Sequence, residues 1–134
     1  MKFWIPGKPQ GKARARTVNN GGRVHSFTPE KTVLYENLIK VCFEQAKPTD
    51  WEPLNSLVEM TVRAVFPVPK SYSKKRREWC LKGYELPCVK PDCDNIAKVV
   101  CDALNGLAYV DDKQIIKLTI TKEYGEEAGV EVTL

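Results

Sequence analysis

The sequence contains one histidine, His25, and none of its five cysteines stands in a C-x-x-C pair. Structural zinc sites usually combine closely spaced cysteine and histidine ligands, so these absences argue against one. The sequence also lacks an apolar run long enough to cross a bilayer and a continuous apolar signal segment near its beginning. We therefore expect a cytoplasmic protein with no membrane partner and no organic cofactor.

An odd number of cysteines without an export signal favours free, reduced thiols, and buried thiols are the simplest interpretation of them. A length of 134 residues and 43% hydrophobic residues are typical of one compact domain, residues 1–134. The length therefore predicts a single hydrophobic core.

The formal net charge of +4 is unevenly distributed. Residues 1–31 carry seven basic side chains and one acidic one, and residues 70–90 carry seven and two. Two basic segments around an acidic centre favour a polyanionic partner, although a charge run is often only a solvated surface. The side chains expected to contact phosphates are Lys8, Lys12, Arg14, Arg16, Lys74, Lys75, Arg76 and Arg77. Nearby, Trp79 and Tyr72 could stack on bases, but aromatic residues more often belong to a core.

Turn residues and periodicity divide the first half into short elements. The pattern predicts a strand at 2–5, a hairpin of strands 13–18 and 23–27 around Asn-Gly, and a helix at 28–46. Thr28 is expected to cap that helix, with Leu34, Leu38, Val41 and Cys42 as its buried stripe.

In the second half, alternation predicts a half-buried strand at 57–66, with Val58, Met60, Val62, Ala64 and Phe66 facing the core. A short basic helix is expected to start near Ser73. The strongest helical pattern begins at Asp94, expected as its N-cap, and closes at Gly106. The segments 113–124 and 130–134 are predicted to form a terminal β-hairpin.

Five aspartates lie within residues 90–112 of this basic chain: Asp92, Asp94, Asp102, Asp111 and Asp112. The last two can return to the helix start after Gly106. Asp94, Lys98 and Asp102 are four apart, so they share one helical face, with Lys98 above the cluster. Carboxylates without histidine or thiolate form a hard-oxygen site, which favours Mg²⁺ or Mn²⁺. Such an ion can activate water for attack on a phosphodiester.

Simpler interpretations exist for each aspartate. Asp94 can serve only as a helix cap, Asp102 only as a partner of Lys98, and the Asp111–Asp112 pair only as turn residues. A calcium-binding EF-hand loop is a poor alternative, because Ala97 stands where it needs glycine and Ala103 where it needs glutamate.

The stretch "KPDCDNIAKVVCDALNGLAYVDDKQI" resembles the motif of the RusA family of Holliday junction resolvases, endonucleases found largely in phages and prophages. The family pattern is roughly PD-x-DN, an apolar position, x, K, then DAL, an apolar residue, DD and x-Q-[IV]. The segments "IPGKPQGKARAR", "TPEKTVLYE" and "SYSKKRR" are also similar to it, so the resemblance covers most of the chain.

The resemblance implies an α+β fold, a mixed β-sheet flanked by helices, assembled as an intertwined homodimer. It implies a crossover junction endodeoxyribonuclease that cuts four-way DNA symmetrically with Mg²⁺, which Mn²⁺ can replace, in recombination and repair in a bacterial or phage-infected cell. By motif position, Asp92, Asp94 and Asp112 are the catalytic metal ligands and Lys98 the active-site lysine. Asp111 would support them, and Asp102 would orient Lys98.

Two alternatives stay open. A metal site alone does not define the substrate, so the protein could cleave other branched or flap DNA. It could also bind DNA without turnover and use its carboxylates for a structural cation. The combination of Asp92, Asp94, Asp112 and Lys98 disfavours the latter, since binding gains little from acids that face phosphates.

Overall fold

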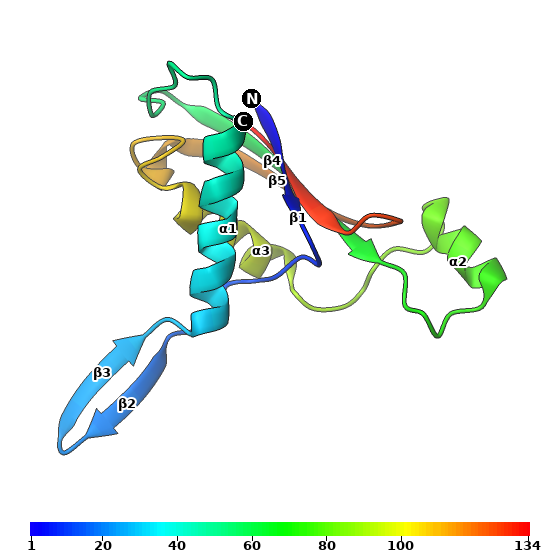
Figure 1. Ribbon diagram of the computed structural model, residues 1–134, viewed down its shortest axis with the longest axis horizontal. Coiled ribbons are helices and arrows are strands. Elements are labelled where there is room, and N and C mark those ends of the chain that lie inside the picture. The colour runs from blue at the N-terminus through cyan, green and yellow to red at the C-terminus, as the bar shows by residue number, and fades with distance from the viewer.

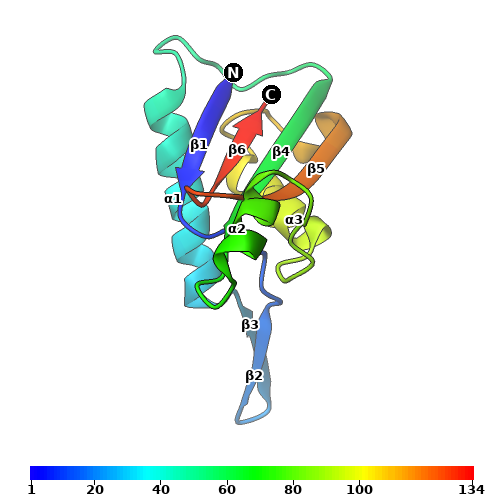
Figure 2. The same ribbon diagram turned by 90° about the vertical axis from the view of Figure 1, so that its right-hand side faces the viewer.

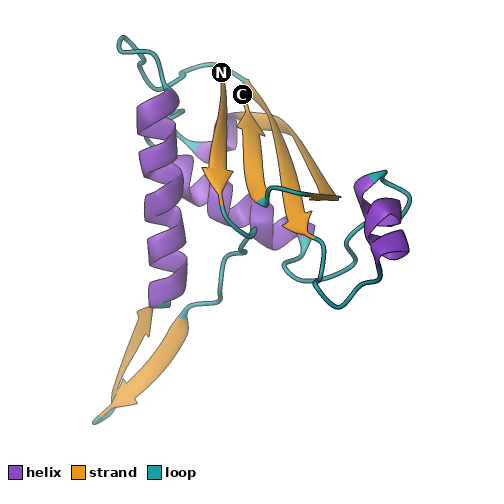
Figure 3. Ribbon diagram, turned by 45° about the vertical axis from the view of Figure 1, so that its right-hand side comes forward, coloured by secondary structure: helices purple, strands orange, loops and turns teal.

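The computed structural model describes all residues 1–134 and shows the expected α+β fold, with one mixed four-stranded sheet. The strand order is β1-β6-β4-β5, with bounds Lys2–Pro6, Gly129–Thr133, Val58–Pro67 and Ile115–Gly125. Helices α1 (Glu30–Ala46) and α3 (Cys93–Leu104) cover one face of this sheet (Figure 1, Figure 3). No helix has the length and apolar character that a membrane span requires.

Two elements project from this body at different sides. The hairpin of β2 (Arg16–Asn20) and β3 (Arg23–Phe27) extends beyond the start of α1, and α2 (Lys74–Leu81) lies beside the other end of the sheet (Figure 1, Figure 2). The hairpin was predicted, but its first strand begins at Arg16 rather than at residue 13. Residues 12–15 instead run along the body, which is important for the site below.

Strand β4 forms the centre of the core, as its alternation predicts. Val58, Met60, Val62, Ala64 and Phe66 are all buried beneath the two helices. On the opposite face of β4, the Arg63 guanidinium lies 2.7 Å from the Glu123 carboxylate of β5 and 3.4 Å from that of Glu131 on β6. One face of the sheet is thus apolar and packed, and the other carries cross-strand ion pairs.

The predicted terminal hairpin is wrong. β5 pairs in parallel with β4, whereas β6 pairs with β4 and β1 in antiparallel fashion, so β4 separates the two last strands. The chain crosses the end of β4 between Gly125 and Gly129. A Cβ at Gly125 would lie 2.5 Å from a methyl group of Val65, so glycine permits the close crossing there.

The buried stripe of α1 is also displaced from the prediction. Its buried residues are Thr32, Tyr35, Ile39 and Phe43. Of the predicted stripe, Leu38 and Cys42 are half-buried and pack against the core, whereas Leu34 and Val41 are exposed. Two apolar stripes one residue apart both fit helical spacing, and the sheet selects the one with the aromatic rings. Thr28 does not cap the helix, because Pro29 occupies the N-cap position without a side-chain hydrogen bond.

All five cysteines are free, as predicted, but they are not uniformly buried. Cys80 is buried, Cys42 and Cys101 are half-buried, and Cys88 and Cys93 are exposed. The expectation of buried thiols therefore holds fully for Cys80 alone.

Candidate active site

Helix α3 presents an apolar and an acidic face. Ile96, Val99, Val100, Ala103 and Leu104 are fully buried, as the helical pattern predicts, and they fix the orientation of the helix. The opposite side carries Asp94, Lys98 and Asp102. The helix starts two residues earlier than expected: Asp92 is the N-cap residue, and Asp94 lies within the first turn. The prediction of Asp94 as N-cap is therefore wrong, although its carboxylate still lies at the positive end of the helix dipole.

Three of the five aspartates share one hollow of about 420 Å³ on the surface. Asp94 and Asp102 reach it from α3, Asp112 reaches it from the following loop, and Lys98 lies among them. Strand β5 supplies an apolar floor through Leu118 and Ile120. We call this the acidic hollow. It unites side chains separated by up to 18 positions in the sequence, as the fold-back after Gly106 predicts.

Asp112 is held in place by a network of side-chain amides. Its backbone N–H donates to Oδ1 of Asn105 at 3.1 Å, just after α3 ends. Gln114 Oε1 accepts from the Asp111 backbone N–H at 2.8 Å, while its Nε2 donates to the carbonyls of Leu54 and Ser56. Sequence reasoning assigned Asn105 and Gln114 no role, although Gln114 belongs to the quoted motif. The loop is therefore anchored to both α3 and the segment before β4.

Asp111 has a structural role here. Its carboxylate accepts from the Lys113 backbone N–H at 3.0 Å and caps the short 3₁₀ helix η1 (Asp112–Gln114). This hydrogen bond lowers the pKa of Asp111. Asp111 does not line the acidic hollow, so it supports Asp112 by ordering the turn.

Lys98 and Asp102 are paired as their spacing predicts, with 3.3 Å between Nζ and Oδ1. The second oxygen of Asp102 lies 3.3 Å from Nζ of Lys12, which also pairs with Glu36 of α1 at 2.5 Å. Burial opposes the charge of Lys12, but hydrogen bonds to Glu36 and Asp102 outweigh it and raise the pKa of Lys12. Nothing in the sequence indicated Glu36, because it lies on a different helix. Lys12 therefore forms ion pairs with protein carboxylates and not with a phosphate.

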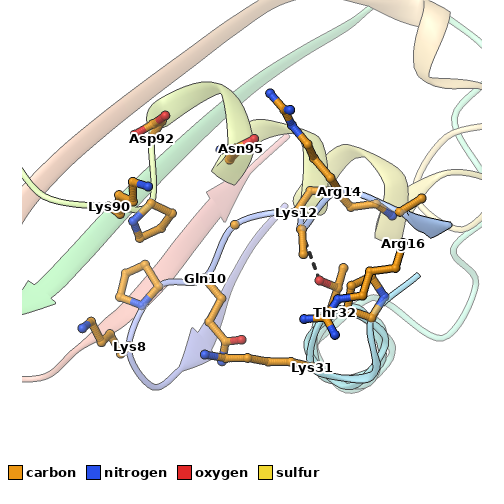
Figure 4. A pocket seen from close by; sticks show the side chains of 16 residues that line it. Lys8, Gln10, Lys12, Arg14, Arg16, Lys31, Thr32, Lys90, Asp92 and Asn95 are labelled. Carbon is orange, nitrogen blue, oxygen red and sulfur yellow. Dashed lines mark hydrogen bonds between the residues drawn. The ribbon is translucent and has the colours of Figure 1, made fainter. Parts of the chain in front are cut away.

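A second hollow of about 1080 Å³ adjoins the start of α3. Figure 4 shows it surrounded by basic side chains from the segment before β2, from the start of β2, from α1 and from the segment before α3: Lys8, Lys12, Arg14, Arg16, Lys31 and Lys90. We call this the basic hollow. Asp92 lines it with Asn95, so the structure places Asp92 apart from the hollow that Asp94 and Asp112 share. The two hollows lie on either side of the first turn of α3.

The segment before β2 lies tightly against that turn. The Lys12 backbone N–H donates to the Asn95 carbonyl at 3.0 Å, and the Ala13 N–H donates to Oγ1 of Thr32 at 3.2 Å, the dashed bond in Figure 4. At Gly11, an added Cβ would lie 2.8 Å from the Asn95 Cβ. Glycine is thus required for the close approach. These contacts hold the basic segment before β2 against the first turn of the acidic helix α3.

The acidic hollow contains oxygen ligands that suit a hard cation. No three histidine, cysteine, aspartate or glutamate side chains converge as closely as a metal-bound cluster would. The acidic hollow nevertheless offers carboxylate oxygens from Asp94 and Asp112. Mg²⁺ usually binds through one or two carboxylates and retains waters, so this pair fits it chemically. Burial and the charges of Asp112 and Asp102 raise the pKa of the neighbouring Cys101 thiol, which disfavours a thiolate ligand for a softer metal.

The family model of endodeoxyribonuclease RusA matches residues 6–134. The chain belongs to the RusA endodeoxyribonuclease family. The sequence is also 38% identical over 136 residues to the uncharacterized protein YqaN of Bacillus subtilis (strain 168), covering 100% of this chain and 94% of that protein. The match to RusA includes both hollows and the whole of α3, so the resemblance seen in residues 90–115 extends across nearly all of the fold.

Proposed function

We propose that the chain is a Mg²⁺-dependent endonuclease that resolves four-way DNA junctions by paired, symmetric hydrolysis, in recombination and repair in the cytoplasm of a bacterial or phage-infected cell. The observation that carries this proposal is the adjacency of the two hollows. A carboxylate pair with a lysine, Asp94, Asp112 and Lys98, lies next to a basic surface of a chain in an endodeoxyribonuclease family. Basic side chains position a phosphate backbone, and carboxylates can bind the ion that acts on it.

In this proposal Asp94 and Asp112 hold Mg²⁺, with Mn²⁺ as a substitute, and Asp92 joins them from the edge of the basic hollow. When bound, the ion polarises the scissile phosphodiester and lowers the pKa of a bound water. Exposed carboxylate side chains at a helix start can rotate towards a cation that offsets their repulsion. The motif position of Asp92 supports its inclusion, and its separate location makes it the ligand with the largest required movement.

Lys98 has the role of stabilising negative charge on the phosphate. Its side chain is 62% exposed and is tethered only to Asp102, with 3.3 Å between the charged atoms. Asp102 is shared with Lys12, so its negative charge is already partly neutralised and holds Lys98 weakly. We expect Lys98 to move from Asp102 to a phosphate oxygen when DNA binds.

A homodimer would place two such sites against one junction. Apolar side chains are exposed on the β2–β3 hairpin and on the outer side of α1: Val18, Val24, Phe27, Val33, Leu34 and Val41. Exposed apolar patches of this kind mark protein–protein surfaces. We propose that a second copy of the chain covers them, which leaves both hollows open to DNA.

The test is cleavage of synthetic four-way junction, flap and linear duplex DNA, each with and without Mg²⁺. We expect symmetric nicks in the junction only when the metal is present. Asp94→Asn should bind the junction nearly as tightly as the wild type but cleave it at least about a hundredfold more slowly, because a neutral amide is a poor ligand for a hard cation. Circular dichroism must show that the variant is folded.

The other results would contradict the proposal in distinct ways. Faster cleavage of flap than of junction DNA would make this a nuclease of a different substrate class. Junction binding without cleavage in Mg²⁺ or Mn²⁺ would make it a binding protein. Full activity in EDTA, after dialysis against the chelator, would eliminate the metal from the mechanism.

A further inference from the structure

Two aromatic rings are stacked on each other and exposed to solvent at α2. Trp79 is 53% exposed and Tyr84 66% exposed, yet their ring centroids are only 4.6 Å apart at an interplanar angle of 35°. Large aromatic side chains are usually buried, and Trp79 lies directly before the fully buried Cys80. The pair lies on the projecting α2 segment, away from the apolar surface of α1 and the hairpin (Figure 1).

The backbone beneath this pair is rigidly held. The Ser73 hydroxyl caps α2 by accepting from the Arg76 N–H, and the Tyr84 N–H donates to the Trp79 carbonyl at 3.1 Å. Between them Gly83 has φ +83°, a left-handed conformation that suits glycine and closes the helix. The position of Tyr84 on Trp79 is therefore set by the end of the helix.

The helix is also held by side-chain contacts with the residues that flank it in the chain. Arg76 lies 3.6 Å above the Tyr72 ring and pairs with Glu85 at 2.9 Å. The Cys80 thiol donates to the same Glu85 carboxylate. Arg76 was predicted to contact phosphates, but the structure uses it to hold α2. These contacts hold α2 in place beside Trp79, while both rings of the pair stay exposed to solvent.

Cations flank the rings on their own side of the helix. Lys75 is four residues before Trp79 and Lys82 three residues after it, spacings that place both beside the ring. Neither forms an ion pair, and neither do Lys74 and Arg77, so these charges are available to a partner. A symmetric contact with a second copy would oppose these cations to each other. A polyanion with flat apolar groups matches the surface better.

We propose that Trp79 and Tyr84 form a stacking platform for an unpaired base of single-stranded or branched DNA, with Lys75 and Lys82 on the adjoining phosphates. Bases are flat, apolar on both faces and joined by phosphates, which is the combination that exposed rings between lysines can bind. The platform rests on the proposed function for its DNA partner, but its binding requires no catalysis.

The test measures binding of a fluorescently labelled oligothymidylate by anisotropy in EDTA, where cleavage cannot occur. We expect Trp79→Ala to weaken single-strand binding by about tenfold and to leave duplex binding within about twofold. Trp79→Phe should retain most of the affinity, because it keeps a ring. Leu86→Ala removes a comparably exposed apolar side chain, 59% exposed, from the same segment and should change nothing.

Three results would overturn the platform. If the wild type and Trp79→Ala bound the oligothymidylate with equal affinity, Trp79 would make no contact with a base. If Trp79→Ala lost the same affinity for single-stranded and duplex DNA, the ring would contact the DNA backbone and not a base. A change from dimer to monomer in sedimentation of Trp79→Ala would assign the rings to a subunit interface. Failure of junction cleavage by the wild type would contradict the proposed nuclease without affecting this binding result.

Discussion

The ammonium group of Lys12 and the carboxylate of Asp102 lie 3.3 Å apart, although 90 positions separate them in the sequence. This contact joins the segment before β2 to the face of α3 that carries Lys98. It also explains why a lysine in a basic run does not face solvent: the Lys12 side chain is only 23% exposed. The relationship makes Lys12 a positioning residue for the candidate site.

The first prediction concerns this contact. Lys12→Met should lower the free energy of unfolding by about 1–2 kcal/mol, because it leaves Glu36 partly buried without a cation and leaves Asp102 with Lys98 alone. Lys98 should then bind Asp102 more tightly and reach phosphate less readily, so kcat should fall more than DNA affinity. Urea unfolding and single-turnover cleavage measure the two effects.

Lys8→Met is the matched control for that experiment. Lys8 lines the same basic hollow and is exposed, and it forms no ion pair. Its substitution removes the same charge but should leave stability unchanged and reduce only DNA affinity. If the two variants behaved identically, Lys12 would be one more phosphate contact and not a positioning residue.

The second prediction concerns the close approach of Gly11 to α3. Gly11→Ala would bring a Cβ to 2.8 Å from the Asn95 Cβ and 3.0 Å from the Pro91 Cβ, so the segment must move away. We expect cleavage to fall by at least about tenfold while the protein stays folded, because the core is untouched. Gly21→Ala, at the remote hairpin tip, strains only the turn through its φ of +62° and meets no atom within 4 Å of the new Cβ, so it should retain activity. Full activity of Gly11→Ala would show that the segment around residue 11 can move away from α3 without loss of cleavage.

The third prediction separates two adjacent arginines. Arg77 forms no ion pair, so Arg77→Ala should weaken DNA binding and reduce its salt slope by about one. Arg76→Ala should instead loosen α2 by removing the contacts with Glu85 and Tyr72. We expect faster amide hydrogen exchange in residues 74–85 of Arg76→Ala and not of Arg77→Ala. Similar exchange in both variants would mean that Arg76 does not hold the helix.

The fourth prediction is a pH dependence of stability. Burial raises the pKa of Tyr35 from 10.0 to about 12, since the residue is only 4% exposed, and the Gln10 backbone offsets only part of this shift. The unfolded chain therefore loses this proton at a lower pH than the folded protein, and stability falls as pH rises between these values. Tyr35→Phe should flatten that fall and leave stability at neutral pH unchanged or slightly higher. Chemical unfolding at several pH values measures it, with exposed Tyr84→Phe as control.

The sequence predicted the parts that depend on local pattern. The buried face of α3, the core face of β4 and the Lys98–Asp102 pair follow from helical or strand periodicity, and each is confirmed. The motif in residues 90–115 also indicated the family correctly. The predictions of periodic segments were correct because a strongly periodic segment has only one apolar face to bury.

The failures share a different cause, because each depends on a tertiary contact. Tyr35 and Leu34 both fit a helical stripe, and only packing against the sheet selects Tyr35. Asp92 and Asp94 both suit a helix N-cap, and the local pattern does not distinguish them. The amide network of Gln114 and the Glu36–Lys12 contact join segments that no local pattern relates.

The insertion of β6 between β1 and β4 has a consequence for biosynthesis. These neighbours leave the ribosome long before residues 129–133, yet they cannot complete the sheet without them. A nascent chain would keep an open gap in its middle until this segment emerges, and the nuclease fold would form only after translation of its final strand. Removing those few residues would therefore empty the centre of the sheet and not trim its edge.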